Sequence, residues 1–280
     1  MLSFYIIIPA HNEEAYLSKT LQSLCEQTLL PKRLVVVNDH STDGTQHIID
    51  QFSEQYSFVS GITIHSEDEH VPGAKVVRAF YRGKELLDDD YDVICKFDAD
   101  LEFPTNYLEV VAGTFLRNSG CGLAGGFCYI EHNGDWVLEG LTNTDHIRGA
   151  LKAYKKECFE QIGGLKPSMG WDTVDELLAR YHGWQVQTIE SLHVKHLKPT
   201  GATYSKASGF KQGQAFGKMR YGFVLTAIAS IKLASRKRSL AYFWHCLRGF
   251  FSIKKDHLVS TTEGQFIRQL RWRGIRKKIF

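Results

Sequence analysis

The sequence lacks the features that mark several protein classes. Its six cysteines form no C-x-x-C pair, so neither a zinc cluster nor a redox pair is indicated. No stretch reaches the roughly 18–20 apolar residues that span a bilayer, and no basic segment or cleavage site at the start marks a signal peptide. Internal repeats, low-complexity tracts and a proline-rich linker are missing too. A disulfide scaffold, a fibrous repeat and a membrane-spanning protein are therefore not expected.

The composition is that of an ordinary globular chain. Hydrophobic residues make up 43% and charged residues 23% of the 280 positions. This length fits one large domain, or one domain with an extension. Several cysteines lie in apolar runs, where a thiol is usually a small core residue. We therefore expect a reducing compartment and a cytoplasmic protein.

Charge is unevenly distributed along the chain. Residues Arg236–Phe280 carry twelve lysines and arginines against two acids, a net charge of +10, and the remaining residues carry −7. A basic tail on an acidic body suggests an anionic membrane surface, nucleic acid or a solvated helix face as its environment.

The first half alternates strand and helix patterns. Strands are predicted at Phe4–Pro9, Arg33–Val37, Ile62–His65 and Val93–Phe97, and helices at Glu13–Gln27, Thr45–Phe52, Ala74–Leu87 and from Pro104. This alternation predicts an α/β fold with a mostly parallel central sheet and helices on both faces. Ligands of such sheets bind at the carboxyl ends of the strands.

The second half has a different pattern. Strands are predicted at Gly120–Ile130, Asp135–Glu139 and Gln185–Ile189, and a helix at Thr173–Tyr181. From Gly209 onward the pattern is helical and basic. We expect a catalytic domain over residues 1–205, divided into halves 1–110 and 111–205, and a basic helical extension over 206–280.

Polar clusters follow three of the predicted strands. They are Pro9–Glu14, Asn38–Thr45 and Asp98–Asp100. Asn12 or Ser41–Asp43 could simply cap the helix that follows, and the third cluster could be an acidic turn. Their occurrence at three strand ends of one sheet favours a polar site instead.

Asp98 and Asp100 have the spacing of a D-x-D metal motif. Two carboxylates separated by one residue can place oxygens on one hard cation, Mn²⁺ or Mg²⁺. Such an ion commonly joins a protein carboxylate to a substrate diphosphate and neutralises charge on the leaving group.

The motifs I-I-I-P-A-H-N-E-E, V-V-V-N-D-H-S-T-D-G-T and F-D-A-D resemble, in order and spacing, those of family 2 glycosyltransferases, which have the GT-A fold. The resemblance covers the first ~110 residues. It implies a nucleotide-sugar donor, with Pro9, His11, Glu13, Asp39 and Asp98 at the nucleotide. It also implies a metal ion on Asp98 and Asp100.

Two further positions are less specific. Lys75 matches a basic residue that often contacts the nucleotide in the family, but it could also be a solvated helix lysine. His196 lies where relatives of this fold often have another metal or diphosphate ligand, and His193, on the other side of an extended segment, is the alternative.

The resemblance extends into the second half through Ile162–Leu165, Gly170–Glu176 and Gly183-Trp184. It implies that Asp172 is the general base that takes the acceptor hydroxyl proton in an inverting transfer. Trp171 replaces the family's usual glutamate. Trp171 could stack on an acceptor sugar or belong to the core, and Asp175 is a weaker acceptor candidate.

The C-terminal third mixes aromatic and basic residues. This composition is typical of interfacial helices on anionic lipid, and equally of helices that pack on the catalytic domain and expose a basic face. No recognisable nucleic-acid motif is present, so nucleic acid is not an expected partner.

The function that the resemblance implies is transfer of a hexosyl or N-acetylhexosaminyl group from a nucleotide-sugar donor, with a UDP-sugar expected, to a hydroxyl of a glycan or lipid-linked glycan. The expected place of action is the inner face of the cell membrane, in polysaccharide assembly. The alternatives are a polyprenyl-phosphate sugar transferase, which needs no base, and an inactive membrane-associated scaffold of the same fold.

Overall fold

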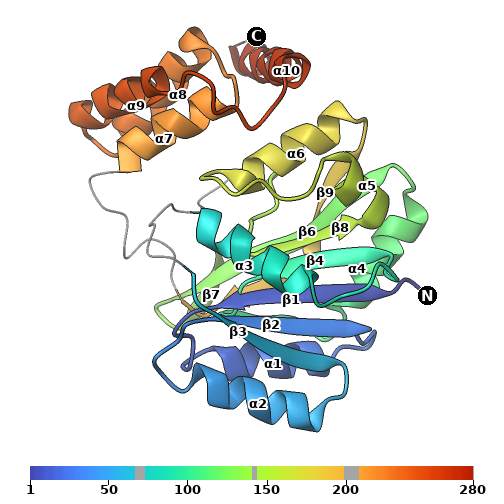
Figure 1. Ribbon diagram of the computed structural model, residues 1–280. Helices are drawn as coiled ribbons and strands as arrows, with labels where there is room; N and C mark the ends of the chain where they lie inside the picture. The colour runs from blue at the N-terminus through green and yellow to red at the C-terminus, as the bar shows by residue number, and fades with distance from the viewer. Residues whose placement is uncertain (67–72, 141–143, 199–207, 280) are drawn as a thin grey trace. The chain divides into compact units, whose positions relative to one another are not determined.

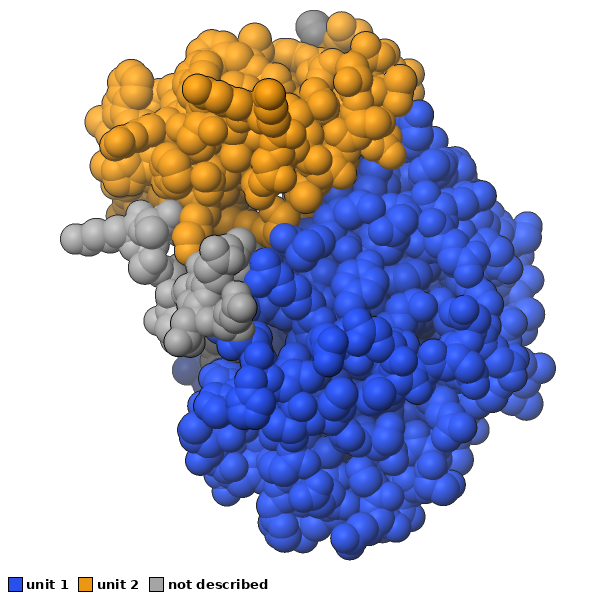
Figure 2. All heavy atoms as spheres, viewed as in Figure 1, with its two compact units in different colours: residues 1–167, 171–200 blue, residues 168–170, 201–280 orange. Residues whose placement is uncertain are grey.

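A computed structural model describes residues 1–66, 73–140, 144–198 and 208–279. The chain forms two compact units (Figure 2). Unit 1 comprises residues 1–167 and 171–200, and unit 2 comprises residues 168–170 and 201–280. The domain boundary expected at 205/206 lies outside the described residues.

Unit 1 is built on a nine-stranded sheet (Figure 1). Its strands are β1 (Phe4–Ala10), β2 (Arg33–Asp39), β3 (Val59–Ile64), β4 (Val93–Phe97), β5 (Leu101–Glu102), β6 (Cys121–His132), β7 (Asp135–Leu138), β8 (Leu151–Lys155) and β9 (Gln185–His196). Their order is β3-β2-β1-β4-β8-β6-β9-β5, and β7 pairs with β6 at the side. The α/β architecture predicted from the alternation of strands and helices is confirmed.

The first four strands of this order are parallel because helical crossovers connect them. A Cβ on Gly83 of α3 (Ala74–Lys84) would lie 2.7 Å from side-chain carbons of Ile7 and Val37, so α3 packs closely on that face. On the other face, Gly61 leaves room for Ile49 of α2 (Thr45–Gln55). Gly61 pairs with Val36, whose side chain points away from that of Val37. Helices therefore cover both faces, and both faces of these strands are apolar.

The second half of the sheet is mixed. β8 runs antiparallel between β4 and β6, while β9 runs parallel to β6 and antiparallel to β5. β8 was not predicted because Lys152 and Lys155 interrupt its apolar pattern. The remaining helices of unit 1 are α1 (Leu17–Cys25), α4 (Tyr107–Arg117), α5 (Lys156–Gln161) and α6 (Trp171–Tyr181).

Unit 2 is helical, as predicted, over its described residues. Its helices are α7 (Ser208–Lys218), α8 (Phe223–Arg236), α9 (Leu240–Ser252) and α10 (Thr261–Ile279). α7 and α9 approach closely through glycines: a Cβ on Gly213 would lie 1.8 Å from the Cys246 carbonyl oxygen, and one on Gly249 would lie 2.0 Å from that of Phe210. Small residues at a helix crossing allow this backbone-to-backbone approach.

Among the helices described, none combines the length and the apolar character needed to cross a bilayer.

Candidate active site

The loops that follow β1 and β2 interlock by hydrogen bonds. The Asn12 backbone N–H donates to Ser41 Oγ at 2.9 Å, and the Asn12 side-chain oxygen accepts from the Thr42 N–H at 2.8 Å. Asn12 has a left-handed backbone (φ 54°), which asparagine tolerates better than most residues. The polar residues at the ends of β1 and β2 are thus hydrogen-bonded to one another without the help of a ligand.

A second set of bonds completes this interlock. The Glu14 carboxylate accepts from the Gly44 N–H at 3.0 Å, and the Glu14 N–H donates to Asp43 at 3.1 Å. Asp43 also accepts from the Thr45 N–H at 3.1 Å, at the start of α2. The capping alternative is therefore correct for Asp43. Asn12 and Glu14 of the first motif, and Ser41 and Thr42 of the second, hold the two loops together.

The interlock orients three of the predicted nucleotide residues at the sheet edge. His11 Nδ1 lies 2.6 Å from the Asp39 carbonyl oxygen, and Pro9 is paired with Val37 in the sheet. The Asp39 carboxylate accepts from the Ser66 N–H at 3.0 Å and from its hydroxyl at 2.7 Å. Pro9, His11 and Asp39 are thus assembled at adjacent strand ends, as the sequence predicts.

Glu13 lies at the same edge in a half-buried position. One of its carboxylate oxygens accepts from Lys198 at 2.9 Å, and the other is buried without a partner among the described residues. Burial raises the pKa of Glu13 against the lowering effect of Lys198, and the carboxylates of Asp100 and Asp98 raise this pKa further. Glu13 therefore shares one electrostatic environment with the D-x-D motif.

The D-x-D aspartates have different surroundings. Asp98 forms an ion pair with the buried Lys96, its neighbour but one in β4. Asp100 is buried, and its Oδ2 lies 3.3 Å from His196 Nε2. The antiparallel pairing of β5 with β9 brings these two together, because it places Leu101 opposite His196. His196 Nδ1 lies 3.0 Å from Glu139, which also pairs with Arg148.

The donor atoms here fit a divalent cation. Asp100 Oδ1 is buried and has no hydrogen-bond partner among the residues that the structure describes, so it is an orphaned carboxylate oxygen of the kind that Mn²⁺ or Mg²⁺ binds. Within the described residues, no three His, Cys, Asp or Glu side chains are arranged to hold a metal ion by themselves. The protein supplies part of a ligand set, which substrate phosphates can complete.

Asp172 lies in the first turn of α6, and a third of its side chain is exposed. Its Oδ2 is 3.7 Å from His146 Nε2. Burial alone would raise the pKa of Asp172, but the His146 contact and the positive charges of Lys152 and Lys96 outweigh burial and lower it. The carboxylate is therefore ionised at neutral pH and remains accessible.

A buried ion network supports the start of α6. The ammonium of Lys152, fully buried in β8, donates to the Asp172 carbonyl oxygen, to Asp175 at 2.8 Å and to Glu176 at 3.2 Å. Burial would lower the pKa of Lys152, but the three acids raise it and keep the ammonium charged. His146 Nδ1 lies 3.1 Å from Glu176. Lys152 therefore holds the backbone of Asp172, and His146 lies against the Asp172 side chain.

One ammonium joins the two halves of the site. Lys96 pairs with Asp98, lies 5.4 Å from the centre of the Trp171 ring, and lowers the pKa of Asp172. The carboxylates of Asp98 and of Asp172 in α6 therefore both interact with the same buried cation.

The two predicted acceptor residues require correction. Trp171 is only 6% exposed, and both Lys96 and Lys152 lie over its ring, so it belongs to the core and cannot stack on a sugar in this conformation. Asp175 is 1% exposed and accepts from Lys152 and from the Tyr154 hydroxyl at 2.5 Å. Asp175 therefore belongs to the buried ion network and is not exposed to an acceptor sugar.

The remaining candidates are placed as follows. Lys75 is half-buried in the first turn of α3, and the loop before it (67–72) lies outside the described residues. The ring of His193 lies 4.3 Å from that of Tyr129, away from Asp100. Of the two histidines, the structure brings only His196 to the aspartates.

Sequence reasoning missed the charged residues that organise this site: Lys96, Glu139, His146, Arg148 and Lys152. A usable signal exists for two of them. Lys96 in V-I-C-K-F and Lys152 in L-K-A-Y are lysines inside apolar strand patterns. A lysine is almost never fully buried unless it is paired, so such a position predicts an acidic partner.

Comparison with known proteins shows which family this chain resembles. The model of the family described as "Glycosyl transferase family 2" matches residues 5–163. The probable glycosyltransferase YdaM of Bacillus subtilis is 34% identical over 97 residues, which are 34% of this chain and 22% of the relative. The beta-monoglucosyldiacylglycerol synthase of Synechocystis is 30% identical over 188 residues, covering 66% of this chain and 37% of that protein. This chain thus spans well under half of these two relatives.

Solved structures share the fold. A Pyrobaculum calidifontis mannosyltransferase in complex with GDP-Man and Mn²⁺ matches with a TM-score of 0.59 and 17% identity, over 100% of this chain and 81% of that one. GalNAc-T7 with UDP, GalNAc and Mn²⁺ gives 0.62 and 14%, over 86% and 51%. The S. aureus TarS 1–349 complex with UDP gives 0.57 and 14%, over 91% and 76%. The predicted GT-A fold is confirmed.

Proposed function

Because the chain belongs to glycosyl transferase family 2, we propose that it transfers a sugar from a nucleotide-sugar donor to a hydroxyl of a glycan or lipid-linked glycan, with inversion at the anomeric carbon. The observation that carries the proposal is that Lys96 pairs with Asp98 and stabilises the charge of Asp172, while Asp100, next but one to Asp98, lies beside His196. The relatives and the solved structures support the reaction class, since they include glycosyltransferases.

The donor nucleotide would lie over the interlocked loops. Asp39 and Glu13 offer carboxylate oxygens to the N–H and O–H groups of a base and a ribose, and Pro9 and His11 form the adjoining surface. Lys198, which donates to Glu13, and Lys75, in the first turn of α3, are cations that could face the phosphates. We propose a uridine nucleotide as the donor; the structural neighbours include complexes with UDP and with GDP-Man.

Asp100 would hold Mn²⁺ or Mg²⁺ through its orphaned Oδ1, with Asp98 and His196 beside it. When bound, such an ion neutralises the charge that develops on the departing diphosphate. His196 is itself held by Glu139, which fixes the orientation of its ring toward Asp100.

Asp172 would act as the base. Its carboxylate is ionised because Lys152, Lys96 and His146 stabilise the charge, so it can accept the acceptor hydroxyl proton as that oxygen attacks the anomeric carbon. The bond from the anomeric carbon to the diphosphate breaks in the same step, and the proton remains on Asp172. The Lys152 contact with the Asp172 backbone keeps the base in place during the transfer.

Calorimetric titration with UDP, GDP, CDP and dTDP, each with and without Mn²⁺, tests the donor site. We expect one diphosphate to bind, and to bind more tightly with the metal. Asp100→Ala should remove the metal dependence, whereas Glu54→Gln, an exposed carboxylate on α2, should leave it intact. Absence of binding by all four nucleotides to the folded chain would contradict the proposal.

We also propose that the protein acts at the inner face of the cell membrane, where a lipid-linked acceptor would be met. The basic and aromatic composition of unit 2 supports this location.

A further inference from the structure

Unit 2 carries a continuous exposed apolar surface, which we call the α8–α9 face. On α8 it comprises Phe223, Val224, Ile228 and Ile231, which are 40–58% exposed. Residues 224, 228 and 231 follow the spacing of one helix side. The buried residues Leu225, Thr226, Ser230 and Ala234 occupy the opposite side. α8 therefore exposes apolar side chains to solvent on the side opposite its buried residues.

α9 continues this surface. Leu240, Trp244 and Phe251, together with the half-buried Leu247, recur at intervals of four, three and four residues along one side. Leu240 is 84%, Trp244 64% and Phe251 62% exposed. The rings of Phe251 and Phe223 lie 5.8 Å apart, so the two helices form one surface.

The segment that contains this face carries charge of one sign. Residues 223–255 include seven lysines and arginines and no acid. Lys232 and Arg248 are exposed and lie one helical turn from apolar members of the face. Arg236 is exposed at the end of α8, and Lys254 and Lys255 follow the end of the face. Cations therefore border the apolar face on both helices.

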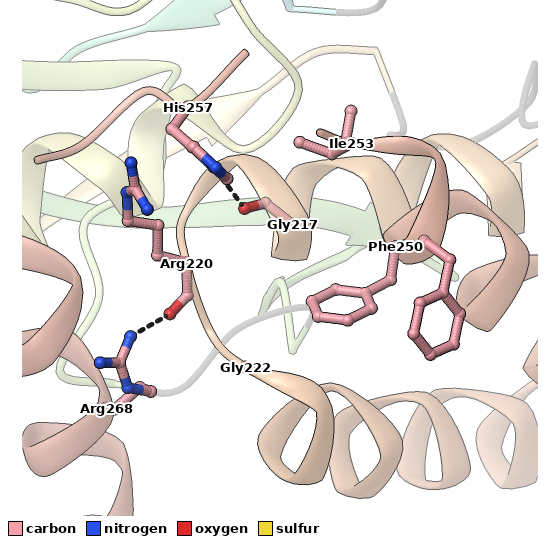
Figure 3. A pocket seen from close by; sticks show the side chains of 8 residues that line it. Gly217, Arg220, Gly222, Phe250, Ile253, His257 and Arg268 are labelled. Atoms are coloured by element: carbon pink, nitrogen blue, oxygen red, sulfur yellow. Dashed lines mark hydrogen bonds between the residues drawn. The ribbon is translucent and has the colours of Figure 1, made fainter. Parts of the chain in front are cut away.

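A pocket adjoins one end of the face. It has a volume of about 260 Å³, and Phe251 of the face is among its lining residues. Arg220, His257 and Arg268 line it, and its lining includes no acidic residue. His257 Nδ1 lies 3.2 Å from the Gly217 carbonyl oxygen, and Arg268 donates to that of Arg220 at 2.8 Å, so both side chains are held in position (Figure 3).

We propose that the α8–α9 face is a docking surface for a lipid bilayer that contains anionic lipids. Side chains such as Trp244, Phe251 and Leu240 would enter the boundary between headgroups and acyl chains, and the bordering cations would bind lipid phosphates. The cationic pocket beside Phe251 would offer one further position for a headgroup phosphate.

Charge distinguishes the bilayer from other occupants. A second copy of the chain would bring seven cations of like sign against this face without a compensating acid in the segment, which opposes association. A nucleic acid would contact the cations and the aromatic rings, but not the aliphatic Val224, Ile228, Ile231 and Leu240. Only a partner that is both apolar and anionic can contact the apolar side chains and the bordering cations together.

Vesicle binding tests this inference without sugar transfer. The full chain is sedimented with sucrose-loaded vesicles of phosphatidylcholine alone, or with one third phosphatidylglycerol. We expect binding to the anionic vesicles that weakens as salt is raised. Asp100→Ala should bind them like the wild type, so failure of the proposed catalytic site and failure of this inference are distinguishable.

Matched variants separate the two contributions. Ile231→Gln with Trp244→Gln should reduce partitioning by about tenfold per residue, whereas Leu86→Gln with Leu116→Gln, equally exposed on unit 1, should not change it. The triple variant Lys232→Gln, Arg236→Gln and Arg248→Gln should lower partitioning into the anionic vesicles on the order of 100-fold. The matched control on unit 1, Lys19→Gln, Arg33→Gln and Arg117→Gln, should show no comparable loss. All six sites are exposed, and circular dichroism verifies folding.

Three results would overturn the inference. They are absence of binding to anionic vesicles by the folded wild type, equal loss in the unit 1 control variants, and a dimer in light scattering that Trp244→Gln converts to a monomer. The last would identify the face as an interface between copies of the chain.

Discussion

The two units place their charged and apolar groups in opposite ways. Unit 1 buries charged side chains, among them Lys96, Lys152, Asp175 and Glu176. In the described part of unit 2, the buried polar residues are the uncharged Ser168, Thr226 and Ser230, and seven large apolar side chains are exposed on α8 and α9.

This difference reflects what each unit must accomplish. A buried charge is costly unless it is paired and hydrogen-bonded, so unit 1 retains its buried charges where they orient other groups, as Lys152 orients the start of α6. An exposed apolar face is equally unfavourable in water unless another surface covers it. The first unit is organised around a site, and the second around a surface. Four changes, ordered from the largest expected effect, test this contrast.

Asp172→Asn should reduce sugar transfer by roughly 10²–10⁴-fold, because an amide cannot take the acceptor proton. Nucleotide binding should remain, since the contacts of Asp172 within the described part of the chain are with His146 and Lys152 rather than with the β1 or β2 loops. Initial rates of transfer, measured beside calorimetric binding, check this. Glu54→Gln is the exposed control. Full activity in Asp172→Asn would instead favour a phosphate acceptor, which needs no base.

Lys152→Met should destabilise unit 1 by about 3–5 kcal/mol, because it leaves Asp175 and Glu176 buried without their cation. Urea unfolding at neutral pH measures the change. Lys19→Met, on the exposed side of α1, should cost little. Comparable stability of the two variants would show that water reaches the network and replaces the ammonium.

The pH dependence of stability should reveal His146. Burial would lower the pKa of His146, but contacts with Asp172 and Glu176 raise it to about 9. A raised pKa means that the stabilisation is fully present below the unfolded value of 6.5 and is lost as pH rises through about 9. The contribution amounts to about 3 kcal/mol. Unfolding of the wild type and of His146→Gln, compared between pH 6 and pH 10, should converge at the alkaline end; a constant difference would contradict the contact.

Gly213→Ala should destabilise unit 2 by about 1–3 kcal/mol, since the added carbon meets the Cys246 backbone and forces α7 from α9. Vesicle binding should weaken, while nucleotide binding by unit 1 is retained. Gly274→Ala in α10 is the matched control: nothing lies within 4 Å of its added carbon, so helix propensity predicts a small stabilisation. Equal effects of the two substitutions would show that the α7–α9 crossing does not depend on close approach.

Much of unit 1 could be predicted because its first four parallel strands are apolar runs with polar ends. β4 is observed over the predicted residues, and β1 and β2 extend beyond their predicted ends by one and two residues. Other boundaries shift by several residues: α1 begins at Leu17 rather than Glu13, because Glu13 and Glu14 are held in the interlocked loops. β8 was not predicted because Lys152 and Lys155 interrupt the apolar pattern of a strand that is in fact buried.

The site shows the same division. Glu13, Asp39, Asp98, Asp100 and Asp172 are recognisable in the sequence by their positions after strands and at a helix start, and their catalytic and binding roles remain predictions. His196 could be placed beside Asp100 only once β5 and β9 were paired, since 95 residues separate them in the chain. For Trp171 the sequence leaves an acceptor contact and a core position equally open, and Asp175 is a weaker acceptor candidate; only the fold shows that both side chains are buried.

The sequence by itself determined the α/β pattern, the strand-end motifs and the concentration of positive charge near the C-terminus, because these depend on local periodicity and composition. Only the tertiary structure decided which charges are buried together, how Lys96 joins Asp98 to α6, and which apolar residues of α8 and α9 remain in solvent. Burial and ion pairing depend on contacts between residues far apart in the chain, and local sequence patterns carry no record of those contacts.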